Sequence, residues 1–366
     1  MQGSKPLNKK ICGFVLCGYD TPVSQSAADG AMLCDFAHKS LMDVNIMDVK
    51  VLADIGPEPF SLIKQKLNES NADFAIALKA ECFVGKDGLK SAVQYCHAQN
   101  GSAKLVADDG SVIGYILDCD CEPVSEVTVN GESITALNFA QIISERKSRR
   151  YTQLINQGVF FESADGAIIS PLAEIGKGTY ISDNCFISGK SIIGENCKLV
   201  GAHIENSVIG SSVSVINSRV LDSSIRDCTR VGPFSYIRPG CKVGSNVKVG
   251  DFVELKNSVI GNNTSISHLT YIGDSDVGQK VNFGCGTVTV NYDGVKKHRT
   301  QIGDYSFIGC NTNIISPVSI GKNVYIAAGS TITDDMPDRA FAIARQRQTT
   351  KNDYVTNKMP QMLKGE

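Results

Sequence analysis

The second half of the chain repeats an apolar residue every six positions. Three such series run from Ile169 to Leu199, from Val231 to Leu255 and from Ile302 to Ile332. A six-residue period fits neither an α-helix nor an alternating strand of a flat sheet. It is typical of a parallel β-helix, in which three hexads close a triangular coil and the coils stack through main-chain hydrogen bonds. We therefore predict that the apolar residues point into a prism, and that the glycines that often follow them relieve its corners.

The repeat is interrupted in two ways. Some steps are five residues long, which we interpret as tightened corners. The large interruption is "TVNYDGVKKHRT", residues 289–300, where the pattern stops after Val288 and resumes at Ile302. A loop that leaves a regular solenoid has no packing reason to exist, so this segment is predicted to serve function.

The first 125 residues have a different pattern, in which strands alternate with helices. We expect strands at 11–18, 44–56 and 72–80, helices at 26–43, 58–70 and 87–99, and then a hairpin with its turn at Asp109-Gly110. This order predicts a small α/β domain with a parallel sheet. The predicted domains are a small α/β domain at 1–130, a connecting helix at 131–158, a β-helix at 159–335 and a C-terminal tail at 336–366.

Composition excludes several classes of protein. The net charge of −2 implies no general attraction to nucleic acid, and "ERKSRR" is interpreted as a solvated helix face. No segment approaches the roughly 20 apolar residues of a membrane span, and no N-terminal apolar leader is found. The thirteen cysteines are scattered without a C-x-x-C pair. We expect reduced thiols in a cytoplasmic protein and no metal site.

Polar side chains that the repeat does not require gather between residues 238 and 297. One coil takes about eighteen residues, so those on successive coils are expected to share a face. Alone, each is typical of an exposed corner, but together they suit an anionic substrate with a nucleophilic centre. Cations bind phosphate and an imidazole accepts a proton near neutral pH. The set is Arg238, Glu254, Lys256, His268, Tyr271, Asn282, Asn291, Tyr292 and Lys297.

Seven phrases in this half carry a resemblance to a known family. They are "GPFSYIRPG", "GDFVELKNS", "SHLTYIGD", "GCGTVTVNYDG", "FIGCN", "IAAGSTIT" and "AIARQRQ". Residues from about 150 to 355 resemble the acetyltransferase domain of the bacterial bifunctional N-acetylglucosamine-1-phosphate uridyltransferase / glucosamine-1-phosphate acetyltransferase. The resemblance covers somewhat over half of the chain.

The resemblance implies a fold, an activity and a partner. The fold is a left-handed parallel β-helix that forms a homotrimer. The activity transfers acetyl from acetyl-coenzyme A to the amine of glucosamine-1-phosphate, for UDP-N-acetylglucosamine and hence cell-wall (peptidoglycan) synthesis. No metal is implied for this reaction.

The resemblance also implies residue roles. His268 is the general base, Glu254 orients its imidazole, and Asn282 is placed with both the catalytic and the sugar-binding residues. The sugar phosphate contacts are Arg238, Lys256, Tyr271, Asn282 and Lys297. The coenzyme A contacts are Cys285, Asn291, Tyr292, Cys310, Ala328 and Arg345. The family also has a serine at the position of Cys310, and a thiol is a weaker hydrogen-bond donor than a hydroxyl.

The front of the chain departs from the family. The family opens with a G-x-G-T-R-M phosphate loop, but this chain has "VLCGYDTPVSQSAADG", in which only Gly18 corresponds. We therefore expect uridyl transfer to be absent and residues 1–130 to be a degenerate nucleotidyltransferase or an unrelated α/β module. Two other functions stay open: acetylation of another amino-sugar phosphate, and a non-catalytic trimeric scaffold or sensor that binds UDP-N-acetylglucosamine or coenzyme A.

Overall fold

The computed structural model describes most of the chain, and its description of the second half has no long gap. The described residues are 10–18, 35, 37–55, 59–70, 72–80, 82–84, 86–98, 102–107, 111–118, 125–128, 131–133, 139–163 and 166–363.

The N-terminal part contains a six-stranded sheet of order β2-β1-β3-β6-β5-β7. Its strands are β1 (Ile11–Gly18), β2 (Val49–Ile55), β3 (Phe74–Lys79), β5 (Ala103–Val106), β6 (Val112–Asp118) and β7 (Ser125–Thr128). β1 pairs in parallel with β2 and β3, but β6 is antiparallel to both β3 and β5. The three strands predicted to alternate with helices therefore pair in parallel, as expected, and the sheet as a whole is mixed because it also contains the hairpin. The predicted β5–β6 hairpin is present, and it forces an antiparallel strand into the sheet because a short connection reverses the chain; its turn, 109–110, lies outside the described residues.

Helices cover this sheet where the pattern predicts them. They are α3 (Phe60–Ser70) and α4 (Lys86–Ala98), and a small antiparallel pair joins β4 (Cys82–Val84) to β8 (Gly131–Ser133). Of the helix predicted at 26–43, residues 35 and 37–42 are helical and the part from 26 to 34 lies outside the described residues, as does the loop after Gly18. Alternate residues of the strands enter separate apolar clusters, for example Phe14 and Val15.

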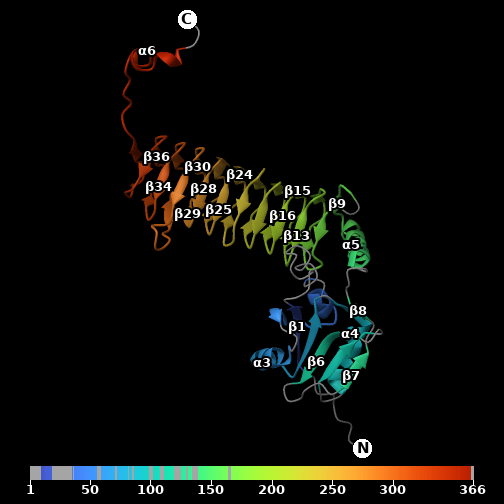
Figure 1. Cartoon of the computed structure of the whole chain (residues 1–366). Coiled ribbons are helices and arrows are strands. Elements are labelled where there is room, and N and C mark those ends of the chain that lie inside the picture. Colours follow the sequence, from blue (N-terminus) through green and yellow to red (C-terminus); the bar gives the residue numbers. More distant parts are fainter. Residues whose placement is uncertain are drawn as a thin grey trace, which may run out of the picture.

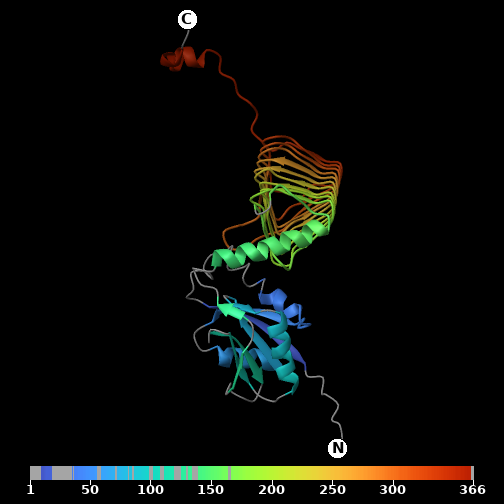
Figure 2. The ribbon, with the colours of Figure 1, turned by 90° about the vertical axis from the view of Figure 1, so that its right-hand side faces the viewer.

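A long helix joins this part to the β-helix. It is α5 (Phe139–Asn156), and Figure 2 shows it lying across the N-terminal end of the prism. Tyr151 attaches it, because its hydroxyl donates to the Ala167 carbonyl at 2.9 Å and accepts from the Ala167 amide at 2.7 Å. The helix therefore covers the first coil of the stack.

The second half is a left-handed parallel β-helix with three faces, as predicted (Figure 1). Face 1 contains β9 (Phe160–Phe161), β12 (Tyr180–Ile181), β15 (Lys198–Val200), β18 (Ser214–Ile216), β21 (Arg230–Val231), β24 (Lys248–Asp251), β27 (Ser265–His268), β30 (Asn282–Phe283), β33 (Phe307–Ile308), β36 (Tyr325–Ile326) and β38 (Phe341–Ala342). Face 2 contains β10 (Ile168–Ile169), β13 (Phe186–Ser188), β16 (His203–Glu205), β19 (Arg219–Leu221), β22 (Tyr236–Ile237), β25 (Glu254–Lys256), β28 (Tyr271–Gly273), β31 (Val288–Val290), β34 (Asn313–Ile315) and β37 (Thr331–Ile332). Face 3 contains β11 (Glu174–Ile175), β14 (Ile192–Ile193), β17 (Val208–Ile209), β20 (Ser224–Ile225), β23 (Lys242–Val243), β26 (Val259–Ile260), β29 (Ser275–Val277), β32 (Thr300–Ile302) and β35 (Ser319–Ile320).

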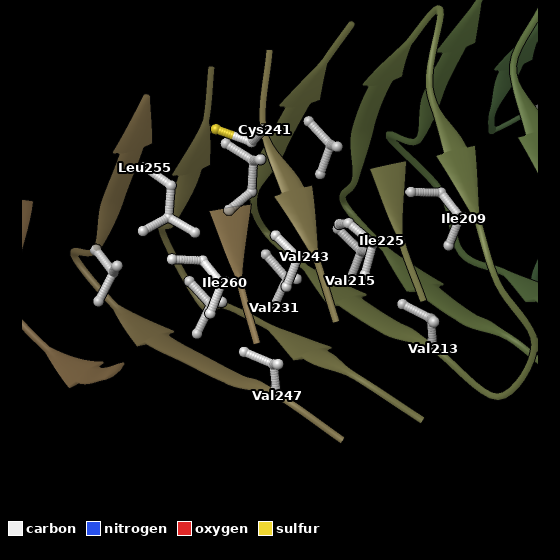
Figure 3. Packing of buried hydrophobic residues seen from close by; sticks show 14 of the residues in the cluster. Ile209, Val213, Val215, Ile225, Val231, Cys241, Val243, Val247, Leu255 and Ile260 are labelled. Carbon is white, nitrogen blue, oxygen red and sulfur yellow. The ribbon is translucent and has the colours of Figure 1, made fainter. Parts of the chain in front are cut away.

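The repeated apolar residues fill the prism. Every member of the three six-residue series is buried, and Figure 3 shows Val231, Val243 and Leu255 pointing inward from the three different faces. The glycines that follow them serve close packing: a Cβ on Gly176 would lie 2.6 Å from the carbonyl carbon of Gly194 on the next coil. Asparagine is the commonest residue at the left-handed corners, for example Asn217 with φ 43°.

The ends of the β-helix and its loop complete the fold. The predicted interruption lies between β31 and β32. Beyond β38 the chain extends away from the prism through α6 (Tyr354–Lys358) and the 3₁₀ turn Pro360–Met362, which contain no buried residue (Figure 1). Among the described helices, none has the length and apolar character needed to cross a membrane.

Candidate active site

One corner of the β-helix, between faces 1 and 2, stacks five residues from successive coils. β24 and β27 pair in register and place Asp251 beside His268. The register of the following strands places Cys285, Cys310 and Ala328 above them. Neighbouring strands lie about 4.8 Å apart, so these residues form a column of regular spacing. We call Asp251, His268, Cys285, Cys310 and Ala328 the corner column.

The histidine of the corner column is held by a carboxylate. Nδ1 of His268 lies 2.6 Å from Oδ1 of Asp251, and the imidazole side chain is about half exposed (55%). The hydrogen bond with His268 lowers the pKa of the Asp251 carboxyl. An ionised carboxylate accepts hydrogen bonds only, so Nδ1 carries the proton and Nε2 is the ring nitrogen able to accept one.

The expected partner of His268, Glu254, lies elsewhere. Its Oε1 accepts a hydrogen bond from Nη1 of Arg238 at 2.9 Å, and this bond raises the pKa of Arg238. Glu254 follows the corner and lies on face 2, whereas Asp251 precedes the corner and stands in register with His268. Asp251 is absent from the set predicted from the sequence, although its position seventeen residues before His268, about one coil, is the signal that identifies it.

The predicted phosphate contacts lie along the other edge of face 2. Arg238 and Lys256 occupy equivalent positions on successive coils, after Ile237 and Leu255. The neighbouring ammonium group of Lys297 lowers the pKa of Lys256, and the positive charge of Arg238 also lowers it. Three cations brought together in this way repel one another, and a bound anion would relieve that repulsion.

Tyr271 lies between the corner column and these cations. It pairs with Glu254 across β25 and β28. The residue two positions on is a glycine for a steric reason: a Cβ on Gly273 would lie 2.3 Å from the Tyr271 hydroxyl oxygen. The ring therefore folds over the edge of face 2, toward the cations.

A buried carboxylate fixes the base of the loop at 289–300. Oδ2 of Asp274 accepts from Nδ2 of Asn291 at 2.5 Å, and Oδ1 accepts from Nδ2 of Asn257 at 2.6 Å. Asn291 also lies 3.4 Å from the Tyr271 hydroxyl. Asn291 was predicted to contact coenzyme A, but its amide is buried and is used to attach the loop to the prism.

The loop is also ordered from within. Oδ1 of Asp293 accepts from the amides of Val295 and Lys296 at 2.7 Å each, and Oδ2 lies 2.6 Å from Nε2 of His298. These contacts, of which the Lys296 amide contributes most, lower the pKa of Asp293 to about 2. The loop is therefore ordered, and it holds Lys297 in one position.

The remaining predicted residues lie around the corner column. Arg345 reaches its upper end, because its Cδ lies 3.5 Å from the position a Cβ would take on Gly329. Tyr292 is exposed on the loop and donates its hydroxyl to the Gly294 carbonyl at 2.7 Å. Asn282 is exposed on face 1, apart from the cations of face 2.

Comparisons with known proteins match this part of the chain. Residues 222–257 and 299–334 match the family model described as bacterial transferase hexapeptide (six repeats). "Bifunctional protein GlmU" of Clostridium botulinum (strain 657 / Type Ba4) is 49% identical over 243 residues, covering 65% of this chain and 53% of that protein. The protein of the same name from Clostridium kluyveri (strain ATCC 8527) is 56% identical over 186 residues, covering 50% and 41%.

Solved structures match the chain more distantly. The UDP-N-acetylglucosamine acyltransferase of Francisella novicida is 20% identical with a TM-score of 0.30, covering 50% of this chain and 67% of that one. The chain spans about half the length of the curated relatives it matches. The resemblance predicted from the sequence is confirmed: the C-terminal β-helix contains two segments that match the bacterial transferase hexapeptide model, and this part of the chain is similar in sequence to the bifunctional GlmU proteins.

Proposed function

We propose that the chain transfers acetyl from acetyl-coenzyme A to the amine of glucosamine-1-phosphate. The observation that carries the proposal is the pairing of His268 with Asp251 at one edge of face 2, opposite Arg238, Lys256 and Lys297 at the other. A strand rises about 3.3 Å per residue, so long cationic side chains span the short width of this face. The face therefore offers a base at one side and an anion site at the other.

The chemistry follows from this arrangement. An ammonium cannot attack a thioester, so the amine must lose a proton, and Nε2 of His268 accepts it while Asp251 stabilises the imidazolium. Main-chain amides near the corner column are available to stabilise the oxyanion of the tetrahedral intermediate. The coenzyme thiolate then leaves. Coenzyme A would lie along the corner column above His268, past Cys285 and Cys310 to Arg345.

The first experiment tests whether His268 is the general base. With acetyl-coenzyme A and glucosamine-1-phosphate, His268→Ala should lower kcat by about 10²–10⁴-fold, the usual contribution of a general base. His203→Ala is the matched control, because the strand pairings place His203 on face 2 several coils before Tyr271. No turnover by the unaltered protein would overturn the function, and equal turnover by the His268 variant would overturn the assignment of the base.

The second test is the anion site. Lys297→Ala should raise KM for glucosamine-1-phosphate about tenfold or more, since a charge-assisted hydrogen bond to phosphate is lost. The same variant should barely change the low activity on glucosamine, which has no phosphate. An equal loss on both substrates would favour a different amino sugar as the substrate.

For the front of the chain, we propose that it does not catalyse uridyl transfer. The support is the missing phosphate loop in the sequence that follows β1. An assay with UTP, Mg²⁺ and N-acetylglucosamine-1-phosphate tests this. Robust formation of UDP-N-acetylglucosamine would contradict the proposal.

A further inference from the structure

Two cysteines occupy neighbouring positions in the corner column. Cys285 and Cys310 are separated by the whole excursion of the loop, yet β30 and β33 pair in register and bring them side by side. Among the cysteines whose side chains the structure describes, they alone stand in register on adjacent coils. The main chain ties them closely: the amide of Asn311 donates to the Cys285 carbonyl at 2.8 Å.

Their backbone separation suits a disulfide. Adjacent strands lie about 4.8 Å apart, which is within the range of roughly 4.4–6.8 Å between the Cα atoms of bridged cysteines. A Cβ on Gly284 would lie only 2.7 Å from the Cα of Cys310, so the two corners are in contact. Cys285 stands between two glycines and Cys310 follows another. Small residues leave room for the side-chain rotation that a bridge requires.

The two thiols also differ in access from the described cysteines that are buried. Cys310 is exposed and Cys285 is partly exposed. Cys185, Cys197 and Cys241 point into the prism, and burial raises the pKa of each of these thiols. The interior cysteines are therefore poor nucleophiles, since the thiolate is the reactive form.

We propose that Cys285 and Cys310 form a reversible redox site that closes to a disulfide when it meets a low-molecular-weight disulfide. The Cys310 thiolate attacks one sulfur of that oxidant and releases one thiolate, which leaves a mixed disulfide on the protein. The Cys285 thiolate then attacks the Cys310 sulfur and releases the second. Two protein thiols lose two electrons and two protons, and the oxidant is reduced to two free thiols.

The bridge would alter the corner directly above His268. This consequence rests on the proposed function, because it assumes that the acetyl donor lies along the corner column. Closing the bridge draws the two sulfur atoms together over the position where the thioester would lie. Acetyl transfer should therefore be lost on oxidation and return on reduction.

The experiment treats the full chain with oxidised glutathione, blocks the remaining thiols with iodoacetamide and maps the peptides by mass spectrometry. A peptide pair joined through Cys285 and Cys310 is expected, and dithiothreitol should release it. Cys310→Ser and Cys285→Ala should each abolish this pair. Cys228→Ser is the matched control, because Cys228 is an exposed cysteine at another corner, and it should leave the pair unchanged.

Activity is measured in the same samples, with each variant compared with its own reduced form. Loss of acetyl transfer in the oxidised protein, its recovery with dithiothreitol, and no such loss in Cys285→Ala would support the proposal. Only glutathionylated single cysteines, or a bridge to another cysteine, would overturn it. If the reduced protein transfers no acetyl, the proposed function fails, while the peptide map still tests the redox site.

Discussion

At the scale of single residues, two ion pairs lie close together on neighbouring strands and do different work. Asp251 contacts the ring of His268, whereas Glu254 contacts the guanidinium of Arg238. The first pair fixes which nitrogen of the imidazole is free, and the second fixes a cation that faces the substrate phosphate in our proposal. Both pairs are exposed, so their value is in orientation rather than in stability.

Replacing these two carboxylates separates their roles. Asp251→Asn should lower kcat by about tenfold or more and change KM little, because the proton acceptor loses its orienting partner. Glu254→Gln should instead raise KM for the sugar phosphate, because Arg238 is released. Steady-state kinetics with both substrates distinguish them. A larger fall in kcat for Glu254→Gln would restore Glu254 as the partner of His268.

Much of the candidate site could be predicted from the sequence: the repeat itself identifies the polar residues that it does not require, and the family resemblance supplies the roles proposed for them. The fold brings together polar residues that the repeat does not require, such as Lys256 and Lys297. The sequence alone does not identify Asp251 as the partner of His268, because Glu254 is also about one coil away from His268. Coil lengths vary by one or two residues, and the corner decides which face a residue joins. Counting residues therefore gives the height of a side chain along the prism more reliably than its face.

At the scale of elements, the loop between β31 and β32 is held at two points. Its base is attached through Asn291 to the buried Asp274. Its tip is closed by Asp293, which receives two amides and the ring of His298. Lys297 stands between these points, so its position depends on both.

Removing the contact between Asn291 and Asp274, at the base of the loop, should destabilise the protein. Asn291→Ala leaves Oδ2 of Asp274 buried without its donor, and an unsatisfied buried acceptor costs about 1–3 kcal/mol. Chemical denaturation followed by circular dichroism measures this. Tyr271→Phe is the control, because it removes only the longer 3.4 Å contact of the same amide. Equal stability of the Asn291 variant and the unaltered protein would contradict a structural role.

Removing the tip contact should change the dependence of stability on pH. The pKa of Asp293 is lowered to about 2, so its contribution is fully present above the ordinary pKa of 3.8 and is lost as the pH falls through about 2. The difference in Tm between the unaltered protein and Asp293→Asn should therefore be largest above about pH 5 and narrow toward pH 3. A difference that stays constant over this range would show that the charge of Asp293 is not what orders the tip.

At the scale of the whole molecule, the chain has separate apolar cores. The prism core includes Tyr151 and Leu154 of α5, whereas the N-terminal sheet has clusters of its own on its two faces. One contact between the parts is the amide of Gly189, which donates to Oδ2 of Asp35 at 3.0 Å. Cores that share no residues can unfold independently.

A shortened chain tests this separation. Residues 139–366 should fold alone and keep the proposed acetyl transfer, because they include α5, which covers the exposed edge of the first coil. A chain that starts at residue 159 is the matched comparison and should aggregate. Calorimetry and sedimentation measure both outcomes, and sedimentation also tests the homotrimer that we propose from the family resemblance. Failure of the longer fragment to fold would show that the N-terminal part supports the prism.

The hexad pattern could be translated directly into the prism because each apolar residue has one neighbour above and one below. Nothing local in the N-terminal sequence shows that β6 enters beside β3, since alternation along a strand does not identify its partner. The handedness of the β-helix also came from the resemblance and not from the period, which is the same for either hand.

The loop shows where the sequence of such a protein can accept an insertion. The coils above and below it meet in register although twenty-five residues separate paired positions such as Gln279 and Asp304. The prism therefore accepts an insertion at a corner without shifting its ladder. At the loop tip, a side chain on Gly294 would meet nothing within 4 Å. Longer segments could be grafted there, as binding loops are on an antibody framework, to give one rigid prism a choice of acceptor molecules.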